Sequence, residues 1–387
     1  MPNGASHMSK KDKSKHELLV KIARNRGFYW PSNEIYGGVA GFYDFGPLGV
    51  RLKLKIMGLW RRMFIYNQDL PIVEIETPII NPRIVFKASG HEDNFTDPIT
   101  ECKKCGKLYR VDHLIEETLD LKVEGLSMDE LWEIMKKHGI KCPIDNGELT
   151  KPKPALLLFK TEIGPYKGSS GYIRPETAQG MFVSFKHVFS ALREKFPLGI
   201  AQIGKVGRNE ISPRQGLIRL REFTIMEIEF FFDPDKAWTE AKSFLEGLLD
   251  EKLSIISADM KVKGVEEPET STLRDFLERK VIVNPWLGYW MAVGNKFLKQ
   301  LGIPEYRIRL YLRNSFDILF GEYPPSLYSI IFLEIFFIAQ SQYGKSLHPQ
   351  LKNSKRRDST IFISFGFVTA SRTSPEKSFA LFNSRVL

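Results

Sequence analysis

Apolar residues recur at helical spacing in several segments of the chain. The clearest is Val50–Tyr66, in which leucine, isoleucine, methionine and aromatic side chains fall on one side of a helix. The same period is found in three further segments, at residues 16–24, 128–138 and 177–195. These segments are predicted to be helices that bury one face.

Strand periodicity dominates much of the sequence between these helices. Residues 72–78 alternate apolar and acidic side chains before Pro78 ends the run. Further runs rich in β-branched and aromatic residues occur at residues 156–161, 171–174, 198–206 and 222–232. The strands are grouped without regular alternation of strand and helix, which favours the α+β class, with an antiparallel sheet flanked by helices.

Composition divides the chain. Residues 1–15 are polar and rich in lysine, and we expect them to form a disordered basic arm. Residues 16–95 and 155–310 are predicted to form one domain, interrupted by a small inserted domain at 96–154 that carries all three cysteines.

The last part of the chain, residues 311–387, has a different composition. It contains 12 Ser and 10 Phe but only five acidic residues, and it has no clear amphipathic period. We interpret this atypical tail either as a divergent terminal domain or as a disordered stretch translated out of frame. The second interpretation is favoured.

Charge and cysteine content narrow the classes of function. With 56 Lys and Arg against 46 Asp and Glu, the formal net charge is +10, which favours a polyanionic partner such as nucleic acid. Three cysteines make a poor disulfide framework and fit a reducing, cytoplasmic setting. The most apolar stretch, residues 330–339, is about half the length needed to span a bilayer and contains Glu334, so no membrane association is expected.

The segment Gly207–Phe231 concentrates ionisable side chains on a predicted hairpin. Its second strand is expected at residues 218–231, where side chains two apart share a face. That face would carry Arg219, Arg221, Phe223, Ile225, Glu227 and Glu229. Charges gathered in this way are costly to bury unless they are paired or hold a ligand. The alternative is a surface hairpin with solvated salt bridges, which contribute little stability.

A second polar constellation lies within Ser169–Phe185. Arg174 and Glu176 flank Pro175, where a predicted strand gives way to a predicted helix. The pair is a candidate ligand site. The alternative is that Glu176 and Thr177 only cap the helix.

Both constellations resemble motifs of a known enzyme family. Arg208-Asn209-Glu210, with the loop and strand that follow, is similar to motif 2 of the class II aminoacyl-tRNA synthetases, and RPETAQ at residues 174–179 resembles the glycyl-tRNA synthetase version of that fold. Three further stretches resemble the eukaryotic and archaeal type of the same family, namely GFYDFGPLGV at 41–50, SGHEDNFTD at 89–97 and FKTEIGPY at 159–166. The resemblance implies a class II synthetase-type antiparallel sheet and glycine–tRNA ligase activity.

The resemblance also implies a role for each matching residue. It places Arg208 on the α-phosphate of ATP, Glu210 on the adenine side and Phe223 against adenine, with Arg208 and Glu210 as the catalytic residues. The implied ATP-binding set is Arg208, Asn209, Glu210, Arg219, Leu220 and Phe223. The implied glycine-binding set is Arg174, Glu176 and Glu227, in which the glutamates suit the ammonium of a substrate that has no side chain. The implied cofactors are ATP and Mg²⁺, and the implied substrates are glycine and tRNA(Gly).

The inserted domain carries a candidate metal site. Cys102 and Cys105, followed by Cys142, resemble a zinc knuckle that a fourth ligand would complete. The alternatives for that position are Asp145, His113 and Asp112, and an empty site stays open.

A helix followed by a proline-ended strand forms motif 1 of the family, which builds the dimer interface. Val50–Tyr66 and residues 73–78 match this arrangement, so the resemblance implies a homodimer.

The resemblance weakens after residues 287–301, which are similar to the next helix of the family. Neither a glycine-rich motif 3 ending in arginine nor an anticodon-binding domain is recognisable, and Arg372 is not assigned a catalytic role. The alternative function is therefore a catalytically incomplete homologue or truncated product that binds ATP, RNA or a dimer partner without aminoacylation.

Overall fold

The computed structural model describes most of the chain up to residue 303 and four strands beyond it. The described residues are 10–303, apart from gaps at 67–68, 120, 122, 124–125, 166–167, 212, 214–216, 218, 234, 258–259, 261–264 and 266, together with 310–313, 317–320, 330–339 and 361–370. Side chains are described from Leu18 to Ile303.

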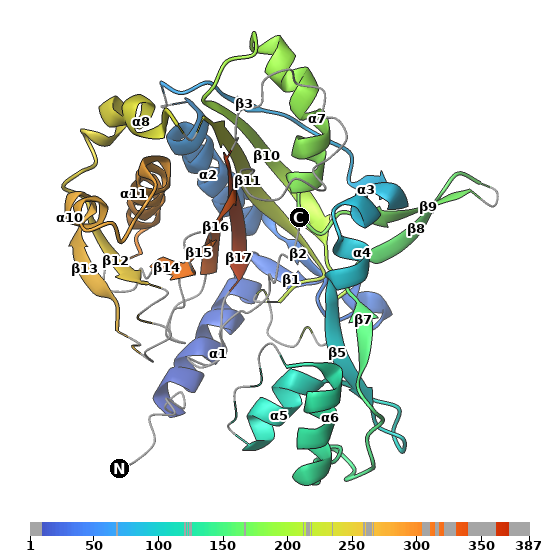
Figure 1. Cartoon of the computed structure of the whole chain (residues 1–387). Helices are drawn as coiled ribbons and strands as arrows, with labels where there is room; N and C mark the ends of the chain where they lie inside the picture. Colours follow the sequence, from blue (N-terminus) through green and yellow to red (C-terminus); the bar gives the residue numbers. More distant parts are fainter. Residues whose placement is uncertain are drawn as a thin grey trace.

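A nine-stranded sheet forms the centre of the molecule (Figure 1). Neighbouring strands run antiparallel except in the pairs β10·β3 and β12·β14, which are parallel. In spatial order the strands are β13 (Glu269–Thr272), β12 (Lys252–Ile256), β14 (Leu310–Arg313), β15 (Asp317–Phe320), β16 (Ile330–Ala339), β17 (Ile361–Ala370), β11 (Glu222–Phe232), β10 (Leu198–Gly207) and β3 (Ile72–Glu74).

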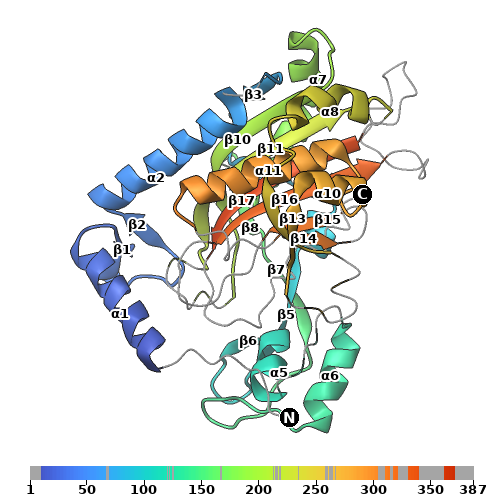
Figure 2. The ribbon, with the colours of Figure 1, turned by 90° about the vertical axis from the view of Figure 1, so that its left-hand side faces the viewer.

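Side chains of β11 alternate between two hydrophobic clusters, one on each face of the sheet. Phe230 and Phe232 join a cluster with Trp60, Trp286 and residues of α2 (Pro47–Arg61), α8 (Ala237–Leu245), α10 (Leu273–Glu278) and α11 (Pro285–Gln300). Phe231 belongs to a second cluster, which includes residues of α7 (Ala178–Ala191). Helix α7 thus covers one face near β10 and β11, while α2, α8 and α11 lie on the other (Figures 1 and 2).

The inserted segment folds around a hydrophobic cluster of its own, away from the large sheet (Figure 2). Its elements are β5 (Thr96–Glu101), β6 (Leu108–Arg110), α5 (Val111–Leu119), α6 (Met128–Lys137) and β7 (Lys153–Leu156). Helix α6 begins at a capping box in which Ser127 and Glu130 satisfy each other's backbone N–H groups. The proposed domain boundaries at residues 96 and 154 stay a prediction.

Shorter elements connect these parts. A three-stranded sheet has the order β4 (Ile80–Pro82), β9 (Ser169–Ile173) and β8 (Phe159–Ile163), and α3 (Arg83–Ala88) and α4 (His91–Asn94) follow β4 in the chain. The N-terminal elements are α1 (Lys10–Asn25), β1 (Tyr29–Pro31), η1 (Glu34–Tyr36) and β2 (Tyr43–Phe45), and a π-helical turn η2 (Arg62–Tyr66) extends α2.

One expected strand begins later than its sequence indicated. Strand β11 starts at Glu222, so the prediction that Arg219 and Arg221 share its face is wrong. The backbone N–H of Arg221 donates to the Gly41 oxygen at 2.8 Å rather than to β10, and its Nε and Nη2 donate to the backbone oxygen of Glu210 at 3.0 and 2.8 Å. The backbone N–H of Arg221 is therefore bonded outside the pairing of β10 with β11.

The atypical tail contributes four strands to the large sheet. Strand β17 pairs with β11 over Met226–Phe232, and β14 pairs with β12. The division of the chain at residues 310 and 311 stays a prediction, and so does the assignment of the tail as divergent or out of frame. The basic arm, residues 1–15, lies largely outside the described residues, as does Arg372.

Candidate active site

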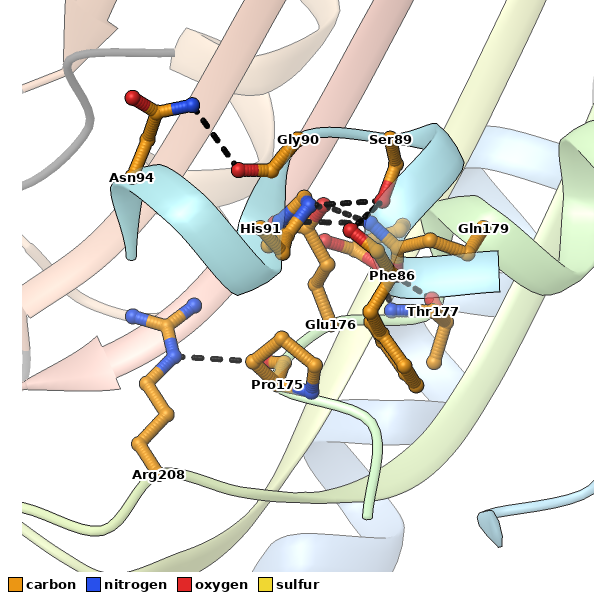
Figure 3. A network of polar contacts seen from close by, with 11 residues as sticks. Phe86, Ser89, Gly90, His91, Asn94, Pro175, Glu176, Thr177, Gln179 and Arg208 are labelled. Carbon is orange, nitrogen blue, oxygen red and sulfur yellow. Dashed lines mark hydrogen bonds and ion pairs between the residues drawn. The ribbon is translucent and has the colours of Figure 1, made fainter. Parts of the chain in front are cut away.

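Three segments meet at the junction between β9 and α7. Strand β9 ends at Ile173, and Arg174 to Thr177 lead into α7. Strand β11 passes beside them, and its Glu227 pairs in register with Gln202 of β10. The third segment is the loop and short helix from Ser89 to Phe95. These elements are distant in sequence, and the sheet brings them together (Figure 3).

Glu227 is held by the start of α7. Its Oε2 accepts hydrogen bonds from the backbone N–H of Thr177, at 2.7 Å, and from the Thr177 hydroxyl. Among the described residues, both bonds fall on Oε2 and none on Oε1. The pKa of Glu227 is raised to about 7, first by burial and then by the negative charge of Glu176, while Thr177 and Arg208 act in the opposite direction.

Glu176 is held in the same way by one oxygen. Its Oε1 accepts a hydrogen bond of 2.5 Å from Gln179 Nε2 and lies 3.2 Å from Nε2 of His91. Among the described residues, no hydrogen bond reaches Oε2. Burial would raise the pKa of Glu176, but His91, Arg208 and Gln179 together hold it below its usual value. The two carboxylates therefore differ, since Glu176 favours its ionised form and Glu227 resists ionisation.

The positive charge of Arg208 lowers the pKa of both carboxylates. Its Nε donates to the backbone oxygen of Pro175 at 3.1 Å, and its guanidinium carbon lies 5.3 Å from the ring centre of Phe223 and 5.8 Å from that of Phe95. Cation–π contacts of this kind fix the plane of a guanidinium without neutralising it. These contacts place the guanidinium of Arg208 against two aromatic rings.

The guanidinium of Arg174 donates hydrogen bonds mainly to backbone oxygens. Its Nε donates to the Lys205 oxygen at 2.9 Å, and its Nη1 donates to the Thr77 oxygen at 2.8 Å. A Cβ on Gly204 would lie 2.1 Å from Arg174 Nη2, so β10 needs glycine at this position to admit the side chain. Arg174 thus ties β9, β10 and the segment after β3 together beside the site.

Glu210 and Arg219 face a second buried ion pair at the base of the insertion. Arg219 Nε lies 3.3 Å from Glu210 Oε2, and Arg110 Nη1 lies 2.9 Å from Asp97 Oδ2. Burial raises the pKa of Asp97 to about 6, Arg110 lowers it, and the charge of Glu210 raises it. The carboxylate of Glu210 is 8% exposed, so a polar ligand group that reached it would meet a largely desolvated acceptor.

This arrangement suits a ligand with an ammonium group beside a phosphate. Among the residues whose side chains are described, hydrogen bonds reach only one oxygen of Glu176 and one of Glu227, so each carboxylate can offer its other oxygen to a cation. Arg208 lies close enough to lower the pKa of both, so an anion bound to its guanidinium would be adjacent to the cation site.

Comparison with known proteins agrees with this geometry. Residues 159–347 match the tRNA synthetase class II core domain (G, H, P, S and T). The chain is 54% identical over 289 residues to a glycine–tRNA ligase of Aeropyrum pernix, covering 75% of this chain and 49% of the relative. It is 49% identical over 295 residues to the glycine–tRNA ligase of Pyrococcus horikoshii, covering 76% of this chain and 50% of the relative.

The chain belongs to the glycyl-tRNA synthetase family of class II, in its archaeal type. It spans about half the length of the curated relatives it matches. Among solved structures, the RNA binding domain of threonyl-tRNA synthetase from Cryptosporidium parvum aligns with a TM-score of 0.42 at 16% identity, covering 90% of this chain and 67% of that one. A likeness this weak carries no argument.

The α+β fold with a largely antiparallel sheet, expected from the sequence, is confirmed for this synthetase chain. The roles assigned to individual residues stay predictions. The structure brings Glu176, Glu227 and Arg208 together and places Phe223 against Arg208. Leu220 packs in a small cluster with Val206 and Phe223, and Asn209 is exposed with its backbone N–H bonded to the Leu157 oxygen.

Three residues of the site were not assigned a role from the sequence. His91, Thr177 and Gln179 contact the two carboxylates, and each lies in a stretch that carries the family resemblance. Their contacts depend on the approach of β11 and of the segment 89–95 to the start of α7. Residue spacing does not reveal that approach.

The cysteines of this synthetase chain gather with Asp145. One ligand atom from each of Cys102, Cys105, Cys142 and Asp145 lies within 4.8 Å of the others. Two similar turns present the thiols, since Gly106 N–H donates to the Cys102 oxygen at 2.9 Å and Asn146 N–H donates to the Cys142 oxygen at 3.0 Å.

The other candidates for the fourth ligand do not join this cluster. Asp112 instead forms a salt bridge of 2.5 Å with Arg110, and the cluster found among the described residues does not include His113. Three thiolates and a carboxylate at this spacing fit tetrahedral Zn²⁺.

None of the helices among the described residues combines the length and apolar character needed to cross a bilayer.

Proposed function

We propose that the chain activates glycine with ATP and passes the glycyl group to the 3′ end of tRNA(Gly). The observation that carries the proposal is the pair formed by the buried Glu227 and the partly buried Glu176, each held through one oxygen by the described residues, near the positive charge of Arg208. The similarity to archaeal glycine–tRNA ligases supports the same substrate.

In this proposal the ammonium of glycine binds between Glu176 Oε2 and Glu227 Oε1. The carboxylate of glycine then attacks the α-phosphorus of ATP, a new bond forms between that oxygen and phosphorus, and pyrophosphate leaves. Arg208 stabilises the negative charge that develops on the phosphoryl oxygens. No protein nucleophile is required, because binding and charge stabilisation carry the step. A ribose hydroxyl of the tRNA then attacks the glycyl carbonyl and AMP leaves.

In this proposal, two residues of motif 2, Phe223 and Glu210, bind the adenine base. Phe223 offers a ring for stacking, and Glu210, ion-paired with Arg219, offers an acceptor to the exocyclic amine of adenine. Mg²⁺ bound to ATP would neutralise the phosphates and favour the departure of pyrophosphate.

Glycine–tRNA ligases must exclude larger amino acids. A closed site that excludes an extra methyl discriminates by steric clash, whereas an open pocket gains only about 1–3 kcal/mol per methylene from a larger substrate. Pyrophosphate exchange measured with glycine, alanine and serine tests this proposal. Exchange with glycine alone is expected, and equal exchange with alanine would overturn the glycyl assignment. Absence of exchange by the folded chain would favour the incomplete homologue that binds ATP or RNA without aminoacylation.

We further propose a homodimer formed through α2. The helix exposes Leu48, Val50, Leu52 and Leu54, with Leu54 57% exposed, although an unpartnered helix would place leucine toward the core. Sedimentation of the wild type and of the Leu54→Asp variant tests the interface. The wild type should sediment as a dimer and the variant as a monomer, while a monomeric wild type would contradict the proposal.

We propose that Cys102, Cys105, Cys142 and Asp145 bind Zn²⁺, which would close two turns of the insertion. Elemental analysis of the purified chain should give about one zinc per chain, and Cys105→Ser should lose it. Lys103→Ser, at an exposed neighbour, is a matched control and should keep the metal. Zinc that is absent from the wild type, or retained by Cys105→Ser, would refute the site. The setting proposed for the protein is the reducing cytoplasm, in which such thiols stay unoxidised.

A further inference from the structure

The segment from Ser89 to Phe95 touches both halves of the candidate active site. His91 lies 3.2 Å from Oε1 of Glu176, on the side assigned to glycine. Four residues later the ring of Phe95 lies against the guanidinium of Arg208, on the side assigned to phosphate. One short segment therefore contacts a residue on each side of the site, and Figure 3 shows His91 directed toward Glu176.

His91 is held in one orientation by its surroundings. The side chain is 5% exposed, and its Nδ1 lies 3.0 Å from the Ser89 hydroxyl oxygen. The rings of Phe86 and Phe95 lie 6.3 and 5.8 Å away, centre to centre. Because an ionised carboxylate only accepts hydrogen bonds, the imidazole must carry a proton on Nε2, which faces Glu176. Ser89 thus fixes one ring nitrogen while the other donates.

The contact of His91 determines which oxygen of Glu176 is available. Both His91 and Gln179 direct their donors at Oε1, and no hydrogen bond from the described residues reaches Oε2. A carboxylate held by two donors on one oxygen loses rotational freedom, so its other oxygen is presented in a fixed direction.

We propose that His91 is a positioning residue for amino-acid recognition, which orients the Glu176 carboxylate so that Oε2 meets the ammonium of the substrate. This inference rests on the proposed function, because it assigns Glu176 to the ammonium. It adds a histidine that does not itself touch the substrate. Gln179 also holds Oε1 of Glu176, but it lies only three residues away in the sequence, whereas His91 belongs to a separate part of the chain.

The simpler alternative is that His91 only packs the segment against the core. The two roles predict different losses of binding. A packing defect at His91 would displace Phe95 as well, and so would weaken the phosphate side together with the glycine side. A positioning role predicts that only ligands with an ammonium lose affinity.

The test compares two ligands by isothermal titration calorimetry with the full chain. The first is 5′-O-(N-glycylsulfamoyl)adenosine, a stable analogue of glycyl-adenylate, and the second is AMP, which lacks the glycyl group. His91→Ala should bind the glycyl analogue about 10- to 100-fold more weakly than the wild type, as expected for a lost hydrogen bond to a charged group. Its affinity for AMP should change less than about twofold, since Arg208 and Phe223 are intact.

Two further variants separate positioning from folding. His91→Gln places an amide N–H near the position of Nε2, so it should recover part of the lost affinity. His187→Ala removes a histidine that is exposed on α7 and should bind both ligands as the wild type does. Thermal unfolding of each variant shows that the compared proteins are folded.

The outcomes distinguish this inference from the proposed function. Wild-type affinity for the glycyl analogue in His91→Ala, or equal losses for the analogue and AMP in a folded variant, would overturn the role of His91. If the wild type bound the glycyl analogue no better than AMP, the proposed function itself would fail, whatever the variants did.

Discussion

Replacement of Glu227 by glutamine should stabilise the folded chain and at the same time remove glycine binding. The carboxyl group is buried, receives two hydrogen bonds from Thr177 and lies near the negative charge of Glu176. The amide of glutamine keeps an oxygen for the Thr177 donors but has no charge to desolvate. The substitution therefore removes an electrostatic cost of folding that the wild type carries when Glu227 is ionised.

The magnitude follows from the pKa of Glu227, which is raised from 4.5 to about 7 in the folded chain. At about 1.4 kcal/mol per pH unit, ionised Glu227 lowers the free energy of unfolding by roughly 3 kcal/mol. The stability that protonation provides is present below pH 4.5 and is lost as the pH rises through 7. Glu227→Gln should thus be more stable than the wild type by roughly 2–3 kcal/mol at pH 8, and the difference should fall to below about 1 kcal/mol at pH 5.

Urea unfolding of both proteins at pH 5 and pH 8 measures these differences. The comparison between variant and wild type cancels other groups that titrate in this range, such as Asp97. Glu162→Gln, on an exposed position of β8, is the control and should show no pH-dependent difference. A difference for Glu227→Gln that is the same at both pH values would refute the account of its environment.

Three further predictions test other parts of the structure. Gly180→Ala would place a Cβ 2.1 Å from Thr77 Oγ1, so α7 must shift, and urea unfolding should show a loss of about 1–3 kcal/mol; an unchanged midpoint would contradict this close approach. Arg110→Leu would leave Asp97 buried without its ion-pair partner, and should cost about 3–5 kcal/mol in the same assay, whereas a loss below about 1 kcal/mol would show that the pair is dispensable. The KM for glycine should rise as the pH falls below about 7, because protonated Glu227 no longer attracts an ammonium, and a KM independent of pH from 5.5 to 8 would exclude Glu227 from glycine binding.

Much of the fold could be predicted from local pattern. The helix expected at residues 177–195 is α7, and the apolar run at 222–232 coincides with β11, although the hairpin strand was expected to begin at residue 218. Along β11, Glu227 and Phe231 lie on one face of the sheet, and Ile228 and Phe230 lie on the other. Period-two spacing predicts this arrangement.

The limits of sequence-based prediction are seen at Arg174 and Arg221. Both were grouped with ligand-facing charges, yet Arg221 donates to the backbone oxygens of Glu210 and Ala40, and Arg174 donates to those of Lys205 and Thr77. Every residue has a backbone carbonyl group, so the pattern of side chains does not show which carbonyl groups will accept a hydrogen bond from an arginine. An arginine that binds carbonyl groups therefore cannot be distinguished by sequence pattern from one that binds a ligand.

His91 illustrates the same limit for contacts across the fold. It is far from Glu176 in sequence, and its contact depends on how α4 packs beside the start of α7. The cysteine cluster is the opposite case, because the CxxC spacing predicts that Cys102 and Cys105 lie together, and the structure places Cys142 beside them.

In the proposed function, Glu176, Glu227 and Arg208 together hold glycine next to the α-phosphate of ATP. Glycine-dependent pyrophosphate exchange by the wild type, Glu176→Gln and Arg208→Ala tests it most directly, with His187→Ala as the control. The account predicts exchange by the wild type and the control, a reduction of at least about 100-fold in Arg208→Ala, and a KM for glycine raised at least about 10-fold in Glu176→Gln. Exchange that persisted at the wild-type rate in Arg208→Ala, with an unchanged KM for glycine in Glu176→Gln, would contradict it.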